Sequence, residues 1–305
     1  MPIPGPGTPL TIGMIADEFG GTPADNLSEY YRGGGLVPDT IANAGIPTSG
    51  IIRIGNFYGS SSRNIVNVTI TGNTQNYDVF ANRGPTYVAG VTDLTLTVNP
   101  GVVVGSASTS SFAMLVPSAF SPTDTVRIVN NGTIIGMGGT GGRGSNGAIG
   151  TSSPGFPGNV GGNALSISRP TTITNNGTVA GAGGGGGGGA PGFGPSSFSA
   201  GSGGGGGGGG AGSSGGTAGV GGAGSTAGNP GGTGTLTTGG GGGAGGPGPA
   251  PGGTGGTGGG QGAVGTSGSP TSRNVGGTGG GAGNYIVGNP FATWPVTGTR
   301  LGGVA

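Results

Sequence analysis

The sequence contains no cysteine, no histidine and no lysine, and all nine of its basic residues are arginines. Without thiolate and imidazole side chains the chain lacks the usual ligands of zinc and the nucleophile–base pairs of many hydrolases. Without lysine it can form neither a Schiff base nor the lysine-containing phosphate-binding loop. We therefore expect no catalytic residues, no metal and no other cofactor, and predict that the protein is not an enzyme.

Charge is scarce as well, because charged residues make up only 6% of the chain. All eight acidic residues precede position 125, where four arginines leave a net charge of −4, and residues 125–305 carry five arginines and no acidic residue. Five widely spaced cations do not form the clustered basic surface that binds nucleic acid. No run of about 18 apolar residues is present, so we expect no membrane insertion. The N-terminal MPIPGPGTPL does not resemble a secretory signal peptide.

Residues 1–62 have the composition of an ordinary small domain. Apolar residues at Ile12, Ile15, Ala16 and Phe19 predict a short amphipathic helix over Thr11–Phe19. LSEYYRG predicts a second helix that Asn26 caps, with Glu29 three residues on as in a capping box, and GIIRIGNFYG predicts a strand. We interpret this part as a docking or assembly module, with a helical cap on the next domain as the alternative. The candidate contact residues are Phe19, Tyr30, Tyr31, Arg32, Phe57 and Tyr58.

Residues 63–136 are rich in predicted strands. NIVNVTITG alternates apolar and polar residues, the pattern of a half-buried strand. Further strands are predicted in YDVFAN, TYVAG, DLTLTVNPGVVVG and TVRIVNNGTIIG. The aromatic residues Tyr77, Phe80 and Tyr87 are expected to pack in the core of this domain rather than to bind a ligand.

One short unit recurs, as TVNPGVVVG (97–105), IVNNGTIIG (128–136) and ITNNGTVAG (173–181). Asn-Gly favours positive φ at two successive positions, so each copy could be a tight hairpin. Alternatively, the copies could stack as equivalent rungs, each covering the apolar face of the one before it. We favour stacking, because the segment between copies lengthens while the unit itself stays intact.

Glycine, which supplies 89 residues of the chain, dominates the sequence from Gly136 onward. Such composition is typical of flexible linkers, and the irregular glycine spacing excludes collagen. Glycine can instead form an extended left-handed helix with three residues per turn, whose N–H and C=O groups point outward to neighbouring helices. The expected fold is mostly β and irregular: a small N-terminal helical module (1–62), a β-rich domain of stacked rungs (63–136), a polyglycine-II helix sandwich (137–284) and a C-terminal closing segment (285–305).

Four loops with large side chains interrupt the glycine tracts, at 190–202, 228–238, 246–253 and 265–277. Exposed aromatic and proline side chains on a rigid frame suit recognition, although the phenylalanines could equally pack against a neighbouring loop. The candidate recognition residues are Pro191, Phe193, Pro195, Phe198, Leu236, Pro247, Pro249, Pro251, Ser272 and Arg273.

The NNGT units followed by glycine tracts resemble the glycine-rich adhesins at the tips of tailed-bacteriophage fibres. The C-terminal FATWPVTGTRLGGVA is similar to the ending of many of them, and LSEYYRGGGLVP with IPTSGIIRIGNFYG resembles a module recurrent in phage tail proteins. The N-terminal module differs from the fibre-attachment domain of T-even-type adhesins.

The resemblance implies a receptor-binding protein of the virion, on the distal tail or tail fibre, made in the host cytoplasm. Its loops would contact an outer-membrane protein or surface glycan of the host, and its N-terminal module would bind other tail proteins. Two other functions stay open on the sequence: a non-adhesive structural component of the tail tip or fibre, and an ice-binding or matrix protein.

Overall fold

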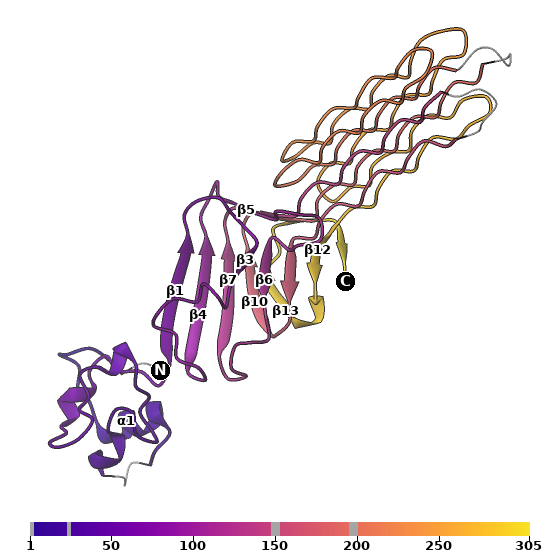
Figure 1. Cartoon of the computed structure of the whole chain (residues 1–305). Coiled ribbons are helices and arrows are strands. Elements are labelled where there is room, and N and C mark those ends of the chain that lie inside the picture. Colours follow the sequence, from indigo (N-terminus) through magenta and orange to yellow (C-terminus); the bar gives the residue numbers. More distant parts are fainter. Residues whose placement is uncertain (1–2, 23–25, 148–152, 195–200) are drawn as a thin grey trace. The chain divides into compact units, whose positions relative to one another are not determined.

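The computed structural model of the chain describes residues 3–22, 26–147, 153–194 and 201–305. The chain divides into two compact units. One consists of residues 1–68, 83–95 and 119–127, and the other of residues 69–82, 96–118 and 128–305. Short helices occur near the N-terminus, strands follow, and most of the remaining chain is extended without forming strands (Figure 1). The fold is therefore β-rich and largely non-helical, as predicted.

The helix α1 (Ile12–Phe19) forms where the apolar periodicity predicts it. The hydroxyl of Thr11 accepts a hydrogen bond from the backbone N–H of Met14 at 3.3 Å, and Gly20 ends the helix with a φ of 83°. Three 3₁₀ helices follow, η1 (Leu27–Tyr30), η2 (Ile41–Asn43) and η3 (Ile54–Phe57).

Two predictions for this part of the chain are wrong. The side chain of Asn26 does not cap η1, and the N–H of Glu29 donates instead to the Asn26 carbonyl at 3.0 Å. GIIRIGNFYG contains the helix η3 rather than a strand, because the side-chain oxygen of Asn56 accepts from the N–H of Arg53 at 2.8 Å. Such local side-chain bonds give the backbone a partner that competes with a β-ladder.

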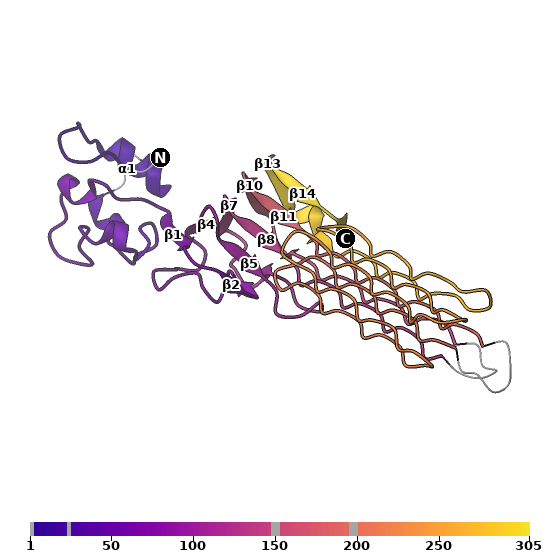
Figure 2. The same cartoon turned by 90° about the horizontal axis from the view of Figure 1, so that it is seen from above.

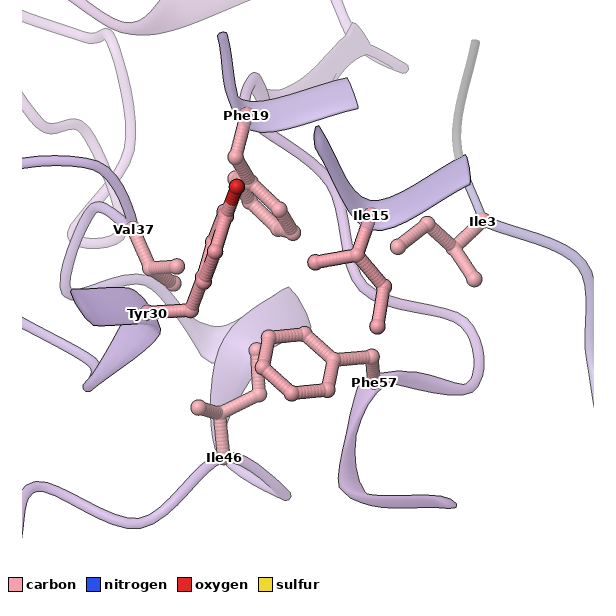
Figure 3. Close-up of a cluster of buried hydrophobic side chains, with 7 residues drawn as sticks. All are labelled: Ile3, Ile15, Phe19, Tyr30, Val37, Ile46 and Phe57. Carbon is pink, nitrogen blue, oxygen red and sulfur yellow. The ribbon is translucent and has the colours of Figure 1, made fainter. Parts of the chain in front are cut away.

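The first unit has a hydrophobic core of its own, drawn in Figure 3. The ring of Phe57 meets those of Phe19 and Tyr30 edge to face, each with 6.2 Å between ring centroids. Edge-to-face pairs of this kind add to the stability gained from burial alone. The residues of this core are Ile3, Ile15, Phe19, Tyr30, Val37, Ile46 and Phe57.

The strands form three five-stranded sheets. The first sheet has the order β1 (Asn64–Ile70), β4 (Thr92–Val98), β7 (Thr125–Asn130), β10 (Thr171–Asn175), β13 (Ala292–Val296). The second has the order β2 (Thr74–Gln75), β5 (Val103–Gly105), β8 (Thr133–Ile135), β11 (Thr178–Ala180), β14 (Thr299–Leu301). The third has the order β3 (Tyr77–Asp78), β6 (Met114–Val116), β9 (Leu165–Ile167), β12 (Asn284–Val287), β15 (Gly303–Val304). Strands such as β5 and β8, β10 and β13, and β9 and β12 pair in parallel within these sheets. Between β12 and β13 lies the 3₁₀ helix η4 (Asn289–Phe291).

These strand orders show that three consecutive strands belong to three different sheets, and that the next three strands pair with them in the same sheets. Each group of three consecutive strands is thus one turn of a stack, hereafter the β-stack, and the strands β1–β15 make five turns. Two predicted strands differ. TYVAG lies outside the strands because the Thr92 hydroxyl bonds to both backbone groups of Val88, and β3 ends early because the carboxylate of Asp78 accepts from the N–H of Phe80 at 2.8 Å.

The repeated unit stacks, as predicted, and the hairpin alternative is excluded. Val103, Thr133, Thr178 and Thr299 occupy equivalent positions in successive parallel strands. The fifth strand of this sheet, β2, belongs to the first turn and pairs with β5. The first copy, in ITGNTQ, and the last one, in VTGTRLG, are not evident from the sequence, because neither contains the Asn-Pro-Gly or Asn-Asn-Gly run of the other three.

The glycine-rich residues leave the β-stack in two excursions, between β8 and β9 and between β11 and β12 (Figures 1 and 2). Within them, residues 136–147, 153–164, 181–194 and 201–283 form what we call the glycine lattice. Its neighbouring segments are joined by backbone hydrogen bonds. Along one segment, successive backbone N–H groups donate to different neighbouring segments, and every third N–H group donates to the same neighbour. Toward one neighbour the donor–acceptor pairs are Gly183–Ala211, Gly186–Gly208 and Gly189–Gly205, and toward a second they are Gly184–Ala263, Gly187–Thr266 and Ala190–Ser269.

A period of three is that of the extended helix with three residues per turn. Apart from Gly248 and Gly262, the described glycines of the lattice have no positive φ, in keeping with a left-handed helix of this type. The segments thus have the hydrogen-bond period and the sign of φ that the predicted polyglycine-II helix would have.

Two inner segments, 182–192 and 201–212, are buried along their whole length. Segment 201–212 donates to residues in 226–235, 139–145 and 253–259, and it accepts from residues in 183–189, 216–222 and 240–246. Six neighbours therefore surround it. A Cβ added at Gly186 or Gly207 would lie within 3.0 Å of a neighbouring carbonyl oxygen. Only glycine allows the segments to approach this closely.

Candidate functional site

The segments of the glycine lattice turn at two opposite ends. The end next to the β-stack carries turns at 212–214, 235–238 and 261–262, and there the Ser213 hydroxyl donates to the Ser106 carbonyl at 3.1 Å. The opposite end, hereafter the far end, carries turns at 224–226, 247–250 and 271–274. Side chains that project from the far end are carried by segments whose backbones are hydrogen-bonded to one another.

Three separate parts of the chain form a groove of about 470 Å³ at the far end. Its largest lining side chains are one phenyl and three proline rings, and no acidic residue lines it. The groove therefore combines apolar surface with a lack of negative charge. The residues that line it are Phe193, Pro249, Ala250, Pro251, Gly252, Gly253, Pro270, Thr271 and Ser272.

A cation lies beside this groove. The guanidinium carbon of Arg273 is 4.3 Å from the centroid of the Phe193 ring, which lines the groove itself. An arginine stacked on an aromatic ring loses part of its side-chain freedom and still presents its N–H groups at the guanidinium edge. The pair thus offers an apolar ring face and an oriented positive charge at one place.

Hydroxyl groups hold the turns of the far end together. The buried Ser202 hydroxyl donates to the Pro247 carbonyl at 2.9 Å, and the Thr226 hydroxyl donates to Ser202 at 2.8 Å. These bonds join the start of an inner segment to two turns of the far end. The groove is therefore built on connected turns.

The sequence matches a known family over the part of the chain that carries these features. The model of the family "Phage tail fibre adhesin Gp38" matches residues 65–305. The chain belongs to this family. It is a phage tail fibre adhesin, with the receptor-binding role and the place on the phage tail that this family has.

Further comparisons add one likeness. No curated protein matches this adhesin. The crystal structure of the gp37–gp38 adhesin tip complex of the bacteriophage S16 long tail fibre contains a similar chain, with 24% identity and a TM-score of 0.46. That match covers 85% of the adhesin and 88% of the other chain.

Five of the predicted recognition residues of the adhesin lie together at the groove. Phe193, Pro249, Pro251 and Ser272 line the groove, and Arg273 stacks on Phe193. Pro247 begins the turn that carries Pro249, and it is exposed. Pro191 is buried beneath these residues, and its contribution is its carbonyl group. Pro195 and Phe198 lie outside the described residues.

Leu236 lies at the opposite end of the lattice from the groove. It lines a separate pocket of about 610 Å³ next to the β-stack, together with residues of β2 and β5 such as Thr74 and Val103. The side-chain amide of Gln261 donates to the Leu236 carbonyl at 3.0 Å and fixes the turn there. The four predicted loops therefore do not form one surface, because successive turns of the lattice alternate between its two ends.

The predicted contact residues of the N-terminal module stabilise the module itself. Phe19, Tyr30 and Phe57 are buried in its core. Tyr31 and Tyr58 donate from their hydroxyls to the carbonyls of Gly50 and Thr8, respectively, and Arg32 forms an ion pair with Asp39 at 2.8 Å. The side chains that this module exposes are different ones, with Ile41 71% exposed and Ile51 74% exposed.

Neither a metal-binding cluster nor a membrane-spanning helix is found among the described residues. Within ranges 3–22, 26–147, 153–194 and 201–305, no group of three or more Asp, Glu, His or Cys side chains could hold a metal ion. In the same part of the chain no helix is both long and apolar enough to cross a membrane. Pro270, Thr271, Ser202 and Asn274 were not predicted as site residues, although the run PTSRN in a glycine tract marks three of them.

Proposed function

We propose that this adhesin attaches the virion to its host through the groove and the Arg273–Phe193 pair at the far end of the glycine lattice. The observation that carries the proposal is the convergence of three separate parts of the chain, with aromatic, proline and arginine side chains, on one groove. Aromatic and arginine residues are the types most enriched among those that dominate binding energy. The receptor would be an outer-membrane protein or a surface glycan of the host, and the contact would involve no catalysis.

Three single variants of the full chain test this proposal. Phe193→Ala and Arg273→Ala should each weaken binding to host cells by about tenfold or more, as removal of a dominant interface residue does. Leu236→Ala is the matched control, because Leu236 is also a loop residue but lies at the other end of the lattice. The measurement is the binding of labelled adhesin to host cells, with competition against phage adsorption. Unchanged binding of both far-end variants, or an equal loss in Leu236→Ala, would exclude the groove as the receptor site.

We also propose that the module of residues 1–62 joins the adhesin to another protein of the tail fibre. Two observations support this. The family match begins only at residue 65, and the similar chain of known structure occurs in a complex between two fibre proteins, gp37 and gp38. The exposed aliphatic residues Ile41 and Ile51 supply apolar surface for such a contact.

Charged substitutions in the full chain test the joining role. Ile41→Asp and Ile51→Asp should reduce co-purification with the fibre protein while binding to host cells stays unchanged. If both variants are incorporated into virions like the wild type, the exposed isoleucines are not the contact.

A further inference from the structure

The edge of the lattice beside the groove contains a ladder of backbone hydrogen bonds that ends in an unusual way. The N–H groups of Gly283, Gly280 and Gly277 donate to the carbonyls of Ala182, Gly185 and Gly188 at 2.9, 2.7 and 2.8 Å. Both series advance by three residues, so the next pair in the ladder is residue 274 with Pro191. There the Pro191 carbonyl accepts from the side-chain amide Nδ2 of Asn274, at 3.3 Å.

Asn274 thus occupies a position that the three-residue period assigns to glycine. At Gly277, Gly280 and Gly283 an added Cβ would meet backbone atoms of the neighbouring segment. Asn274 is only 4% exposed and lies in the same inward register. Because its amide replaces a peptide N–H, the backbone at this point can stand farther from the inner segment and still supply the last bond of the ladder.

The same carbonyl also holds the other side of the turn. The hydroxyl of Thr271 donates to the Pro191 carbonyl at 2.9 Å, and the N–H of Thr271 donates to the Asn274 carbonyl at 2.9 Å. Both ends of the turn 271–274 are therefore tied to one atom of the inner segment. Arg273 lies within this turn, and Phe193 follows Pro191 by two residues, so the two bonds bring the stacked pair together.

We infer that Asn274, with Thr271, is a positioning residue for receptor binding, which holds Arg273 over Phe193 before the receptor arrives. This inference rests on the proposed function of the far end. Two side chains from distant parts of the chain bind a partner more tightly when they are already ordered in the free protein, because less conformational entropy is then lost on binding. Asn274 itself is buried and does not contact the receptor.

The test uses the full chain and variants that remove single bonds. Asn274→Asp keeps the shape of the side chain but removes the donor, and Thr271→Val removes the hydroxyl. Each should weaken binding to host cells by about tenfold, the effect of one lost buried hydrogen bond. Asn229→Asp is the control, since Asn229 is an exposed asparagine of the lattice and should bind like the wild type.

A double-mutant cycle separates positioning from general loss of structure. In an Arg273→Ala background, Asn274→Asp should cost clearly less binding than it does alone, because there is no guanidinium left to position. Hydrogen exchange gives a readout without receptor: the Thr271 amide should lose protection in Asn274→Asp, while the amides of Gly277 and Gly280 keep theirs.

The outcomes distinguish this inference from the proposed function. If Phe193→Ala and Arg273→Ala bind normally, the far end is not the receptor site and both proposals fall. If those two variants lose binding but Asn274→Asp and Thr271→Val do not, only the positioning role is overturned. Full additivity of Asn274→Asp and Arg273→Ala would likewise overturn it, because the buried amide would then act independently of the arginine.

Discussion

The side chains of Asn130 and Asn175 meet in adjacent turns of the β-stack, where the amide of Asn130 donates to the side-chain oxygen of Asn175 at 2.8 Å. Both residues are buried, and the amide of Asn175 in turn donates to the carbonyls of Thr297 and Thr299 in the last turn, at 2.8 and 3.2 Å. The Asn-Asn-Gly of the repeated unit thus forms a ladder of amides that links three turns.

Replacement of Asn175 by alanine should therefore destabilise the β-stack. The change leaves the donor of Asn130 and two carbonyls without this partner, and each such buried group costs about 1–3 kcal/mol. The neighbouring Asn176 is exposed and its side-chain amide donates to the side-chain oxygen of Asn131 at 2.9 Å, so Asn176→Ala should change stability by less than about 0.5 kcal/mol. Urea-unfolding midpoints of the two variants would show the difference, and equal midpoints would contradict the ladder.

The inner glycines of the lattice should tolerate no side chain. At Gly186 an added Cβ would collide with the carbonyl of Gly256, whereas at Gly241 it would meet nothing within 4 Å. Gly186→Ala should lower the free energy of unfolding by more than about 3 kcal/mol, and Gly186→Asp by more still, since overpacking of a rigid interior is costly. Gly241→Ala should be neutral or slightly stabilising. Thermal unfolding of the three variants is the measurement, and wild-type melting of Gly186→Asp would show that the segments are not closely packed.

The N-terminal module should depend on its aromatic core. Phe57→Ala removes a fully buried ring that packs on Phe19 and Tyr30, and it should cost about 3–5 kcal/mol. Ile51→Ala, at an exposed position, should have little effect. Limited proteolysis of the full chain would report this: Phe57→Ala should be cut within residues 1–62 under conditions in which Ile51→Ala and the wild type stay intact.

The stability of the first unit should fall in acid through Asp93. Burial raises the pKa of Asp93, but hydrogen bonds from Arg63 at 2.6 Å and from Thr125 at 2.6 Å outweigh it. The positive charge of Arg127 acts in the same direction, so the pKa of Asp93 lies below its usual value of 3.8. A lowered pKa stabilises the fold above pH 3.8, and this contribution disappears as the pH falls through the lower pKa.

The measurement is the urea midpoint of the first unit as a function of pH. Below about pH 4 the midpoint of the wild type should fall more steeply than that of Asp93→Asn, which has no carboxyl group to protonate there. At neutral pH the wild type, with its ion pair between Asp93 and Arg63 intact, should be more stable than Asp93→Asn. Parallel curves for the two proteins would exclude Asp93 as a source of the acid sensitivity.

Sequence patterns predicted the parts of the fold that depend on local repetition. The apolar spacing of Ile12, Ile15 and Phe19 placed α1 correctly, because a short amphipathic helix depends mainly on its own residues. Stacking of the NNGT units was also predictable, since a unit that keeps its turn residues while its insertions lengthen must pack against its own copies. ITGNTQ and VTGTRLG were not predicted, because the first and last turns occupy the same register without the Asn-Pro-Gly or Asn-Asn-Gly run of the other copies.

The remaining errors come from bonds that no periodicity encodes. GIIRIGNFYG is predicted as a strand, but the N–H of Arg53 donates to the side-chain oxygen of Asn56 and a helical turn forms there. The sequence predicts Phe57 and Tyr30 as contact residues, but both are buried, because so small a module needs them for its own core. Leu236 and Arg273 have similar sequence surroundings, and only the lengths of the intervening segments decide that they lie at opposite ends.

Each excursion of the glycine lattice begins at the second strand of a β-stack turn and ends at the third strand of the same turn. A chain that departs from and returns to one end must cross the lattice an even number of times. Two crossings occur between β8 and β9, and the longer excursion between β11 and β12 also closes on the stack. Segments can therefore be gained or lost only in pairs, each pair bringing one turn at the far end, and such a change leaves the register of every strand untouched. The far end can therefore gain or lose turns, one for each pair of lattice segments, without any compensating change in the β-stack.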